Sequence, residues 1–388
     1  MKSVTGFGKA DTMTLGILVL NSGSSSLKFG VYMPGKKSDA TADSGDETPW
    51  LTGSAKGIGR DDGSLTMRSS DGAIDVTQNH VMESQHDALQ RVADALHAHL
   101  DQPLAAVGHR VVHGGPHLSG HALITPEVKQ ILRDAVQFAP LHLPQALELL
   151  DLAQQIFNDV PHYACLDTAF HRTMPARATH LALPKHYADE GVIRYGFHGL
   201  SYESIVATLG NDLPPRLVVA HLGSGASLCA IRDGRSIDTS MGLTPSGGIP
   251  MATRTGDLDP GVLVYLMRTG TLDADALEHL INHESGLKGL SDSNDDMQAL
   301  LQRSDADAEL AIDIFCTAVR KTIGAYAALM GGLDRVVFTG GIGEHAATVR
   351  ERICDGLEFL DVQFDVIETQ EERQIARHCR TLLGQPTT

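Results

Sequence analysis

The sequence lacks the signatures of several large classes of protein. Its 48 acidic residues exceed its 31 Lys and Arg, which gives a formal charge of −17. Proteins that bind nucleic acid through the phosphate backbone need a basic surface, so we expect no nucleic-acid partner. No apolar run approaches the length of a membrane-spanning helix, so we expect no membrane association. Residues 1–12 lack the apolar core of a secretory signal, and we interpret them as an extension ahead of Met13.

Cysteines and phosphate-binding motifs are also sparse. The five cysteines are scattered, odd in number and free of any C-x-x-C pair, a pattern that predicts a cytoplasmic protein. The Walker A pattern G-x-x-x-x-G-K-[ST] does not occur, which argues against a P-loop fold. An acidic protein that binds an anionic substrate must draw it in with a local cluster of cations. The positions of a few arginines therefore become the main question.

A turn of glycine and serine occurs twice, about two hundred residues apart. The first copy lies in Ile17–Phe29 and the second in Leu217–Leu228, each between runs of strand-forming residues. Such a turn can present backbone N–H groups and hydroxyls to one phosphate. Two copies suggest two similar half-molecules that face a nucleotide, although each copy alone is also compatible with an ordinary hairpin.

The rest of the chain predicts strands that alternate with helices. At 388 residues it is too long for one ordinary core, so two domains are expected. Residues 35–80 should form hairpins and loops that extend the first sheet. The pattern predicts helices at 84–100, 126–138, 144–157, near Ser201, 308–330 and 371–383, and strands at 105–112, 162–166, 217–237 (a hairpin turning at Arg232–Arg235) and 335–338. An α/β architecture repeated once accounts for this order.

Several polar residues end or interrupt these expected elements. Arg110 ends an apolar strand and Arg254 lies among turn formers, and each could pair with a carboxylate or bind an anion. Asp167 closes a buried strand, where a lone carboxylate is costly unless it meets a metal ion or a partner. His171 and His198 are equally well explained as core histidines with satisfied hydrogen bonds.

Two further motifs have competing interpretations. The glycines of Phe338–His345 follow a strand directly and would let a flat ligand or phosphate approach the backbone, but a plain strand-to-helix turn explains them equally well. The histidines between His109 and His121 recur every four residues, as metal ligands on a helix would. Gly114 and Pro116 would break such a helix, so we reject a histidine metal site.

Taken in order, short segments along the chain resemble the acetate kinase family, the acetate and propionate kinases of the sugar kinase, heat-shock-cognate and actin superfamily. The resemblance runs from Leu15 to Arg377. The segments are Asn21–Ser26, His109–Gly115, Pro140–His142, Leu166–His171, Tyr195–Gly199, His221–Gly225, Thr253–Asp257 and Thr339–Glu344. It implies two duplicated ribonuclease-H-like domains around a central nucleotide cleft, residues 13–167 joined by the helix of 371–388, and residues 168–370. It also implies a homodimer.

The resemblance further implies a phosphotransferase with a carboxyl group as acceptor. Such an enzyme uses ATP to convert acetate, or propionate, reversibly into an acyl phosphate by direct in-line transfer, with Mg²⁺, or Mn²⁺ in its place. The attacking carboxylate is already ionised at neutral pH, so no general base is needed. The main obstacle is the repulsion between the carboxylate and the γ-phosphoryl group. Catalysis therefore requires that the enzyme position the two groups in line and neutralise their negative charge.

The resemblance also implies a role for each residue of this sequence that matches a functional position in the family's motifs. The implied catalytic residues are Arg110, Asp167, His198, Arg254, His142 and His221. The implied binding residues are Arg110, Val112, Leu141, Phe197 and Pro245 for the carboxylic acid, Lys28, Gly223, Ser224, Gly225, Gly340, Gly341, Ile342 and Gly343 for the nucleotide, and Asn21 and Glu371 for the metal ion.

The sequence departs from the family pattern at several positions. Ser224 replaces an asparagine in the second glycine turn, Leu143 replaces an asparagine beside His142, and Ala252 and Thr255 replace Gly and Ser around Arg254. The stretch from Phe359 to Glu371 is shorter than usual, as if a strand and a loop were missing. An alternative function is therefore a nucleotide-binding regulatory protein on the same fold with little phosphotransfer. A third interpretation changes only the preferred acid.

Overall fold

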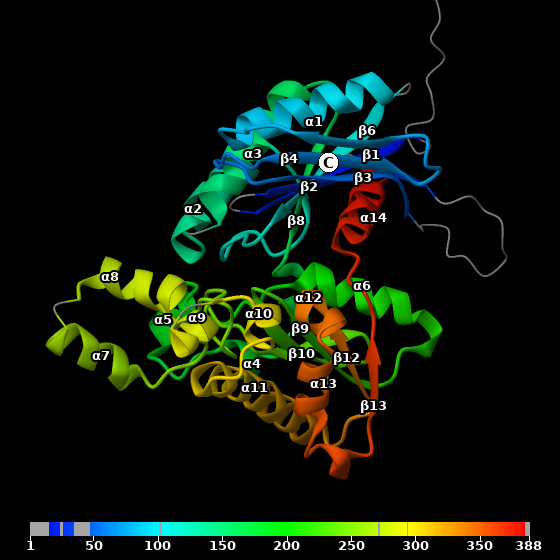
Figure 1. Ribbon diagram of the computed structural model, residues 1–388. Helices are drawn as coiled ribbons and strands as arrows, with labels where there is room; N and C mark the ends of the chain where they lie inside the picture. The colour runs from blue at the N-terminus through cyan, green and yellow to red at the C-terminus, as the bar shows by residue number, and fades with distance from the viewer. Residues whose placement is uncertain are drawn as a thin grey trace, which may run out of the picture. The chain divides into compact units, whose positions relative to one another are not determined.

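The computed structural model describes residues 15–23, 26–34, 47–100, 103–140, 142–270, 272–292 and 294–384. The chain forms two compact units, the first made of residues 1–169 and 370–388 and the second of residues 170–369 (Figure 1). The extension at residues 1–12 and the expected pocket residue Leu141 lie outside the described residues. Within the described ranges, no helix is both long and apolar enough to cross a membrane.

The first unit is built on a mixed sheet, which has eight strands in the part of the chain that the structure describes, in the order β5-β4-β3-β2-β1-β6-β8-β7. β1 pairs antiparallel with β2 and parallel with β6, and β6 pairs parallel with β8. The carboxyl ends of β1, β6 and β8 therefore lie at the same edge. The strands are β1 Gly16–Gly23, β2 Ser26–Pro34, β3 Glu47–Lys56, β4 Ser64–Ser69, β5 Asp75–Asn79, β6 Leu104–Val111, β7 Ala122–Leu123 and β8 His162–Leu166.

Helices cover both faces of this sheet (Figure 1). On one face, α1 and α3 pack with strand residues such as Val107 in one apolar cluster. The neighbouring residue Gly108 faces the other way, toward α14, because successive strand residues point to opposite faces. A Cβ on Gly108 would lie 2.6 Å from both Cys379 Sγ and Ile375 Cγ2, so only glycine allows α14 to pack this closely. The helices are α1 Gln85–His99, α2 Pro126–Asp134, the 3-10 helix Ala135–Phe138, α3 Leu143–Ile156 and α14 Glu371–Leu383.

A buried ion pair attaches α14 to the sheet. Arg380 Nε donates to Glu47 Oε1 at 2.7 Å, and Arg380 Nη2 donates to Glu47 Oε2 at 3.2 Å. The side chains are 8% and 1% exposed, respectively. Removing either partner would leave the other charge buried without its counterpart, which strongly destabilises a fold.

The second unit repeats the central arrangement of the first. Its described strands follow the order β11-β10-β9-β12-β13, with β9 antiparallel to β10 and parallel to β12. Asp233 and Gly234 both have positive φ between β10 and β11, the geometry of a type I′ turn, as the Arg232–Arg235 signal predicts. The strands are β9 Arg216–Leu222, β10 Ala226–Arg232, β11 Arg235–Thr239, β12 Arg335–Thr339 and β13 Gln363–Val366.

Two main helices sandwich this second sheet (Figure 1). Residues of α6 pack with Val219 and Ile231 in one apolar cluster, while the long helix α11 packs against β9 and β10. The α-helices are α4 Ala176–Thr179, α5 Lys185–Asp189, α6 Gly199–Leu209, α7 Pro260–Thr269, α8 Ala274–His279, α9 Gly286–Ser291, α10 Met297–Leu300, α11 Ala306–Met330, α12 Gly340–His345 and α13 Ala347–Cys354. The other helical segments are Ala169–Thr173, Gly210–Asp212, Leu280–Glu284 and Glu358–Leu360.

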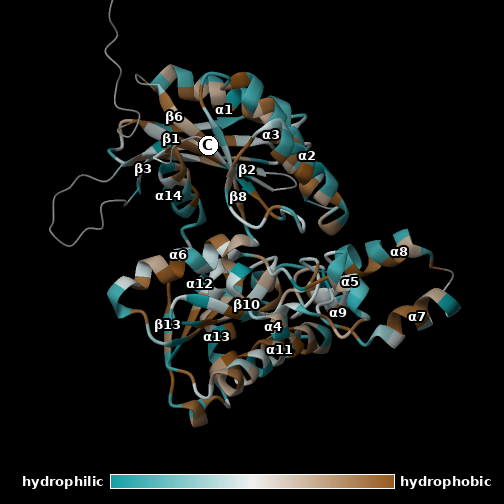
Figure 2. Cartoon of the chain, turned by 180° about the vertical axis from the view of Figure 1, so that it is seen from behind, coloured by the Kyte–Doolittle hydropathy of each residue, from teal (hydrophilic) through white to brown (hydrophobic). Residues whose placement is uncertain are grey.

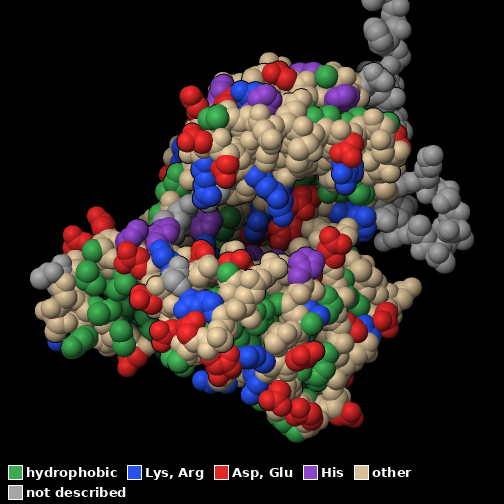
Figure 3. All heavy atoms as spheres, viewed as in Figure 1, with side chains coloured by type: hydrophobic (Ala, Val, Ile, Leu, Met, Phe, Trp, Pro, Cys, Tyr) green, Lys and Arg blue, Asp and Glu red, His purple; other side chains and the backbone are tan. Residues whose placement is uncertain are grey.

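Helix α7 is apolar along much of its length, yet it buries none of its residues (Figure 2). Tyr265 is 64% exposed, and Val262, Val264 and Met267 are exposed beside it. Hydrophobic side chains consequently gather on the surface around α7 (Figure 3). An exposed apolar surface of this kind is typical of an interaction site.

The structure confirms the α/β class with two sheets and corrects some local predictions. The expected glycine turn at 339–343 is the short helix α12, which begins directly after β12. The helix expected over 126–138 changes to a 3-10 helix after Asp134. The short stretch from Phe359 to Glu371 still contains a strand, β13, which pairs parallel with β12.

Candidate functional site

Five polar side chains meet at the edge of the first sheet where β1, β6 and β8 end. Arg110 on β6 donates from Nε to Asp167 Oδ1 at 3.1 Å and from Nη2 to Asp167 Oδ2 at 2.7 Å. Its Nη1 lies 3.3 Å from Asn21 Oδ1 and 3.5 Å from Glu371 Oε2. Asn21 in turn donates to Glu372 Oε1 at 3.0 Å. Glu371 and Glu372 begin α14, so the end of the chain completes a cluster started by β1.

This cluster contains more carboxylates than cations. Burial by itself disfavours the charged guanidinium of Arg110, but the carboxylates of Asp167 and Glu371 outweigh this effect and raise its pKa. Burial also raises the pKa of Asp167, whose side chain is 2% exposed; the ion pair with Arg110 opposes this shift and Glu371 adds to it. The excess of buried negative charge favours a further cation at this place.

The donor set fits a hard divalent cation. Asp167 and Glu371 offer carboxylate oxygens and Asn21 offers an amide oxygen, which are the ligand types that Mg²⁺ prefers. The expected nucleotide residue Lys28 lies on β2 directly opposite Asn21 in the strand register, and its side chain is exposed.

In the second unit, a space at the turn between β9 and β10 is bordered by a histidine and an arginine. A Cβ on Gly225 would lie 3.4 Å from His198 Nε2 and 3.7 Å from Arg254 Nη1. The two nitrogens therefore face a common space that only the absence of a side chain keeps open. Two nitrogen donors around one space are suited to an anionic oxygen.

His198 and His221 lie together near this turn. His198 precedes α6 in a left-handed conformation (φ 57°), which is rare for a residue with a side chain and often marks a functional position. His221 is on β9, and the two imidazole rings stack with centroids 4.3 Å apart. Nδ1 of His198 lies 2.8 Å from Ser227 Oγ, and Nδ1 of His221 lies 2.8 Å from Ser201 Oγ.

Arg254 is positioned by its own loop. Its Nη1 donates to the carbonyl oxygen of Pro245 at 3.1 Å, and burial lowers the pKa of its guanidinium. Gly286 allows this loop to pack, because its φ is positive and a Cβ there would lie 2.7 Å from Arg254 O. A desolvated guanidinium interacts more strongly with an anion than one in water does.

His171 has the character of a core histidine. It is fully buried, with Nδ1 2.9 Å from Ser236 Oγ and Nε2 2.9 Å from the carbonyl oxygen of Phe197. Burial lowers its pKa to about 4. Of the two histidines with open alternatives, His171 therefore follows the structural interpretation, whereas His198 faces the space at Gly225.

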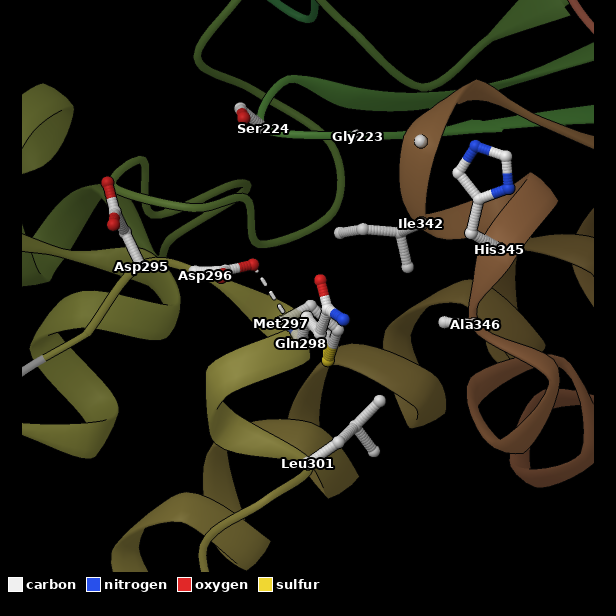
Figure 4. Close-up of a pocket in the computed structure, with 11 residues that line it drawn as sticks. Gly223, Ser224, Asp295, Asp296, Met297, Gln298, Leu301, Ile342, His345 and Ala346 are labelled. Carbon is white, nitrogen blue, oxygen red and sulfur yellow. Dashed lines mark hydrogen bonds between the residues drawn. The ribbon is translucent and has the colours of Figure 1, made fainter.

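A cavity of about 430 Å³ borders the same glycine turn at Gly223 and Ser224 (Figure 4). Ser224 comes from the turn, Ile342 and His345 from α12, and Met297, Gln298 and Leu301 from α10 and the residue after it. Asp296 caps α10 by accepting from Gln298 N at 3.0 Å. The lining residues are Gly223, Ser224, Asp295, Asp296, Met297, Gln298, Leu301, Gly341, Ile342, His345 and Ala346. The residues from Asp295 to Leu301 were missed at the sequence level, where no motif marks them.

Gly340 at the start of α12 packs against β9 and also donates to a carboxylate. Gly340 has a φ of 78°, and a Cβ on it would lie 2.8 Å from Leu222 O, so this position requires glycine. Glu344 Oε1 accepts from Gly340 N at 2.8 Å and from Thr369 N at 3.1 Å. Gly341 has no atom within 4 Å of a Cβ position and lies open at the cavity, whereas Gly343 is buried.

The structure places the remaining expected residues as follows. His142 is half-buried and precedes α3, and Val112 follows β6 directly; both belong to the first unit. Phe197 and Pro245 belong to the second unit, where Phe197 is buried and each carbonyl oxygen accepts a hydrogen bond. The common pocket expected for Val112, Leu141, Phe197 and Pro245 thus remains a prediction.

Comparisons of sequence agree with these features. The Acetokinase family matches residues 16–381. An acetate kinase from Methylocella silvestris is 42% identical over 399 aligned residues, which cover 95% of this chain and 98% of that relative. An acetate kinase from Coprothermobacter proteolyticus is 41% identical over 365 residues, covering 90% of this chain and 88% of the relative.

Solved structures lead to the same conclusion. The acetate kinase of Porphyromonas gingivalis has a TM-score of 0.82 at 32% identity, covering 95% of this chain and all (100%) of that one. A propionate kinase from Francisella tularensis subsp. tularensis SCHU S4 has a TM-score of 0.84 at 34% identity, with coverage of 94% and 98%. The sequence resemblance is thereby confirmed: the chain belongs to the acetokinase family.

Proposed function

We propose that this protein transfers the γ-phosphoryl group of ATP to the carboxylate of acetate, forming acetyl phosphate and ADP, and that the reaction is reversible. One observation carries the proposal: His198 Nε2 and Arg254 Nη1 face the same space at Gly225, and that turn also borders a cavity of about 430 Å³. A phosphoryl site beside a nucleoside-sized cavity is the minimum that a kinase requires.

The chemistry follows from charge. A carboxylate oxygen of acetate forms a bond to the γ-phosphorus while the bond from that phosphorus to the oxygen bridging to the β-phosphate breaks, and the electron pair leaves with ADP. No proton is removed from the nucleophile, because acetate is ionised near pH 7. The barrier is dominated by alignment and by repulsion between anions, which fixed cations and donors reduce.

The residues of the second unit act on the transferring group. Arg254 neutralises charge on the phosphoryl oxygens, and its burial strengthens this effect. His198 donates from Nε2 to one of these oxygens, and His221 lines the path of the group beside it. Gly225 supplies the space in which such an oxygen can be held.

In the first unit, Arg110 binds the carboxylate of the acid. Asp167 accepts two hydrogen bonds from the Arg110 guanidinium, and these bonds hold the guanidinium in one orientation before the substrate binds. His142 is assigned to the phosphoryl path. Val112, Leu141, Phe197 and Pro245 are assigned to the alkyl group, with room for a short chain that includes propionate.

The nucleotide occupies the cavity of the second unit with its phosphates toward the glycine turn. The charges favour this orientation, because Asp295 and Asp296 line the cavity and would repel a phosphate. The uncharged base then lies near the apolar side chains of Met297, Leu301 and Ile342. Gly223, Ser224 and Gly341 let the phosphates approach the backbone, Gly340 and Gly343 let the start of α12 pack closely against β9, and Lys28 contributes a positive charge.

Asn21, Asp167 and Glu371 would hold a Mg²⁺ ion, for which Mn²⁺ can substitute. When bound, this ion neutralises phosphate charge and orients the ATP tail. The support comes from the donor set itself, which is all oxygen and carries more negative than positive charge.

The proposed assembly is a homodimer formed through α7. This helix buries none of its residues within one chain and exposes Val262, Val264, Tyr265 and Met267. Sedimentation of the wild-type protein should give a dimer, and Tyr265→Asp should give a monomer. A dimer that persists in this variant would place the interface elsewhere. A cytoplasmic location stays a prediction from the cysteine pattern.

The deciding experiment traps acyl phosphate as hydroxamate after incubation with ATP, Mg²⁺ and either acetate, propionate or butyrate. We expect product from acetate and propionate and little from butyrate. The absence of product with every acid, in protein that still binds ATP, would reject the proposal in favour of a regulatory nucleotide-binding protein. Ser224→Asn would then be the first variant to examine.

A further inference from the structure

Two chains of hydrogen-bonded hydroxyl groups end at His198 and His221, the stacked histidines of the second unit. In the first, Tyr202 Oη lies 2.5 Å from Ser227 Oγ, which lies 2.8 Å from His198 Nδ1. In the second, Thr369 Oγ1 donates to Ser201 Oγ at 2.8 Å, and Ser201 Oγ lies 2.8 Å from His221 Nδ1. Tyr202, Ser227 and Ser201 are almost fully buried, so water does not compete for these hydrogen bonds.

The direction of each chain follows from its donors. Ser201 Oγ receives the Thr369 hydrogen, and among the described residues its own hydrogen has His221 Nδ1 as its side-chain acceptor. A phenol is a stronger hydrogen-bond donor than an aliphatic hydroxyl, so Tyr202 donates to Ser227, which then donates to His198 Nδ1. In both cases Nδ1 accepts, which places the ring proton on Nε2.

Stacking of the rings disfavours a state in which both are protonated imidazolium ions. Their centroids are 4.3 Å apart with planes inclined by 29°. Two imidazolium cations at this separation would repel each other, whereas two neutral rings with the proton on Nε2 do not. A neutral ring held in this tautomer is also a ready hydrogen-bond donor at Nε2, the atom of His198 that faces the space at Gly225.

We infer that Ser227 with Tyr202, and Ser201 with Thr369, are positioning residues that hold His198 and His221 as neutral Nε2–H donors to the phosphoryl group. This inference rests on the proposed function for the identity of the acceptor. It assigns a role to four hydroxyl residues that lie outside the substrate, nucleotide and metal sites proposed above. The second chain also reaches the nucleotide side, because Thr369 N donates to Glu344, which binds Gly340 N.

The first test is the protonation state of the histidines in the whole protein. Nitrogen-15 NMR of histidine-labelled protein should show a pyridine-type Nδ1 and a pyrrole-type Nε2 for His198 and His221, with signals assigned through His198→Gln and His221→Gln. A protonated Nδ1 in either ring would overturn the inference. This measurement does not depend on turnover, so it remains decisive even if the protein forms no acyl phosphate and the proposed function fails.

The second test separates positioning from general structure. Ser227→Ala and Ser201→Ala should each lower kcat about tenfold, roughly the effect of losing one hydrogen bond, with the KM for ATP unchanged within about twofold. Thr369→Val should lower kcat by about threefold, and Thr369→Ser should restore it.

The matched control is Thr239→Val, which removes a buried hydroxyl that donates to Leu228 O beside Ser227 but bonds neither histidine. It should leave kcat unchanged. Equal losses in the control and in Ser227→Ala, or full activity in both serine variants, would refute positioning by these chains.

Discussion

Replacing Gly225 by alanine should lower kcat about 100-fold while leaving the fold intact. The added methyl carbon would lie 3.4 Å from His198 Nε2, 3.6 Å from His198 Cε1 and 3.7 Å from Arg254 Nη1, all ordinary contact distances. Gly225 is not among the residues with positive φ, so the backbone accepts alanine. Such a change at a compatible position stabilises a protein by about 0.4–1 kcal/mol through the unfolded state. The folded enzyme should therefore melt at the same or a slightly higher temperature.

The same substitution should lower the rate of phosphoryl transfer, although it does not lower stability. An oxygen that accepts from His198 or Arg254 needs a separation of about 2.8–3.0 Å from the nitrogen, and it needs roughly 3.5 Å from a methyl carbon. The methyl group fills the shared space, so the oxygen must move by on the order of 1 Å, a displacement that costs about 100-fold in rate. This corresponds to about 2.7 kcal/mol of lost transition-state stabilisation.

The assay is hydroxamate formation from acetate at saturating ATP, combined with thermal unfolding and calorimetric titration of ADP. Gly324→Ala is the matched control, because it makes the same chemical change in α11 where no atom lies within 4 Å of the new carbon. We expect wild-type activity in the control and a kcat reduced about 100-fold in Gly225→Ala. A rate within about threefold of wild type in well-folded Gly225→Ala would refute the assignment of this space to the phosphoryl group.

Three further predictions concern charge. Burial lowers the pKa of His171 to about 4 from 6.5, so the unfolded chain binds a proton at this residue more readily than the folded protein does. The contribution of His171 to the free energy of unfolding should therefore be fully present above about pH 6.5. It should fall by about 3 kcal/mol as the pH drops toward 4. Urea titrations of the wild type and His171→Gln check this, and an equal loss in both would contradict it. Glu47→Ala should lower the free energy of unfolding by about 3–5 kcal/mol, because it leaves Arg380 buried without its counterion; an unchanged urea midpoint would contradict this. Chelation by EDTA should stop acyl phosphate formation, Mg²⁺ or Mn²⁺ should restore it, and Glu371→Gln should raise the Mg²⁺ concentration needed; full activity in EDTA would contradict a metal requirement.

Local signals explain which elements the sequence predicts well. Apolar runs that end in small residues predicted both hairpins, and His162–Leu166 and Glu371–Leu383 have the bounds expected of them. Strand pairing and helix periodicity depend on neighbours within a few residues, which a single sequence displays. The glycines after β12 were less clear, because a turn and a short helix begin with the same residues at that point.

The candidate site was harder to predict, because it depends on contacts between distant segments. The family resemblance supplied Arg110, Asp167 and Glu371 as separate motifs, but only the structure shows Asp167 and Glu371 around one guanidinium. The wall of the cavity at Asp295–Leu301 has no motif and comes to the glycine turn through tertiary packing. The roles of Ser201 and Ser227 could not be predicted either, because serine is common and the residues that its hydroxyl contacts are distant in the sequence.

The attachment of α14 to the first sheet has a consequence for synthesis on the ribosome. The first unit is begun by β1 but receives Glu371 and Arg380 only after the whole second unit has been translated. Until α14 emerges, Glu47 lacks its counterion and the cluster around Arg110 lacks one of its carboxylates. The second unit can therefore complete its fold while the first unit still lacks α14. A nascent chain stalled before α14, or one clipped there by a protease, would carry a complete second unit and an unfinished first unit.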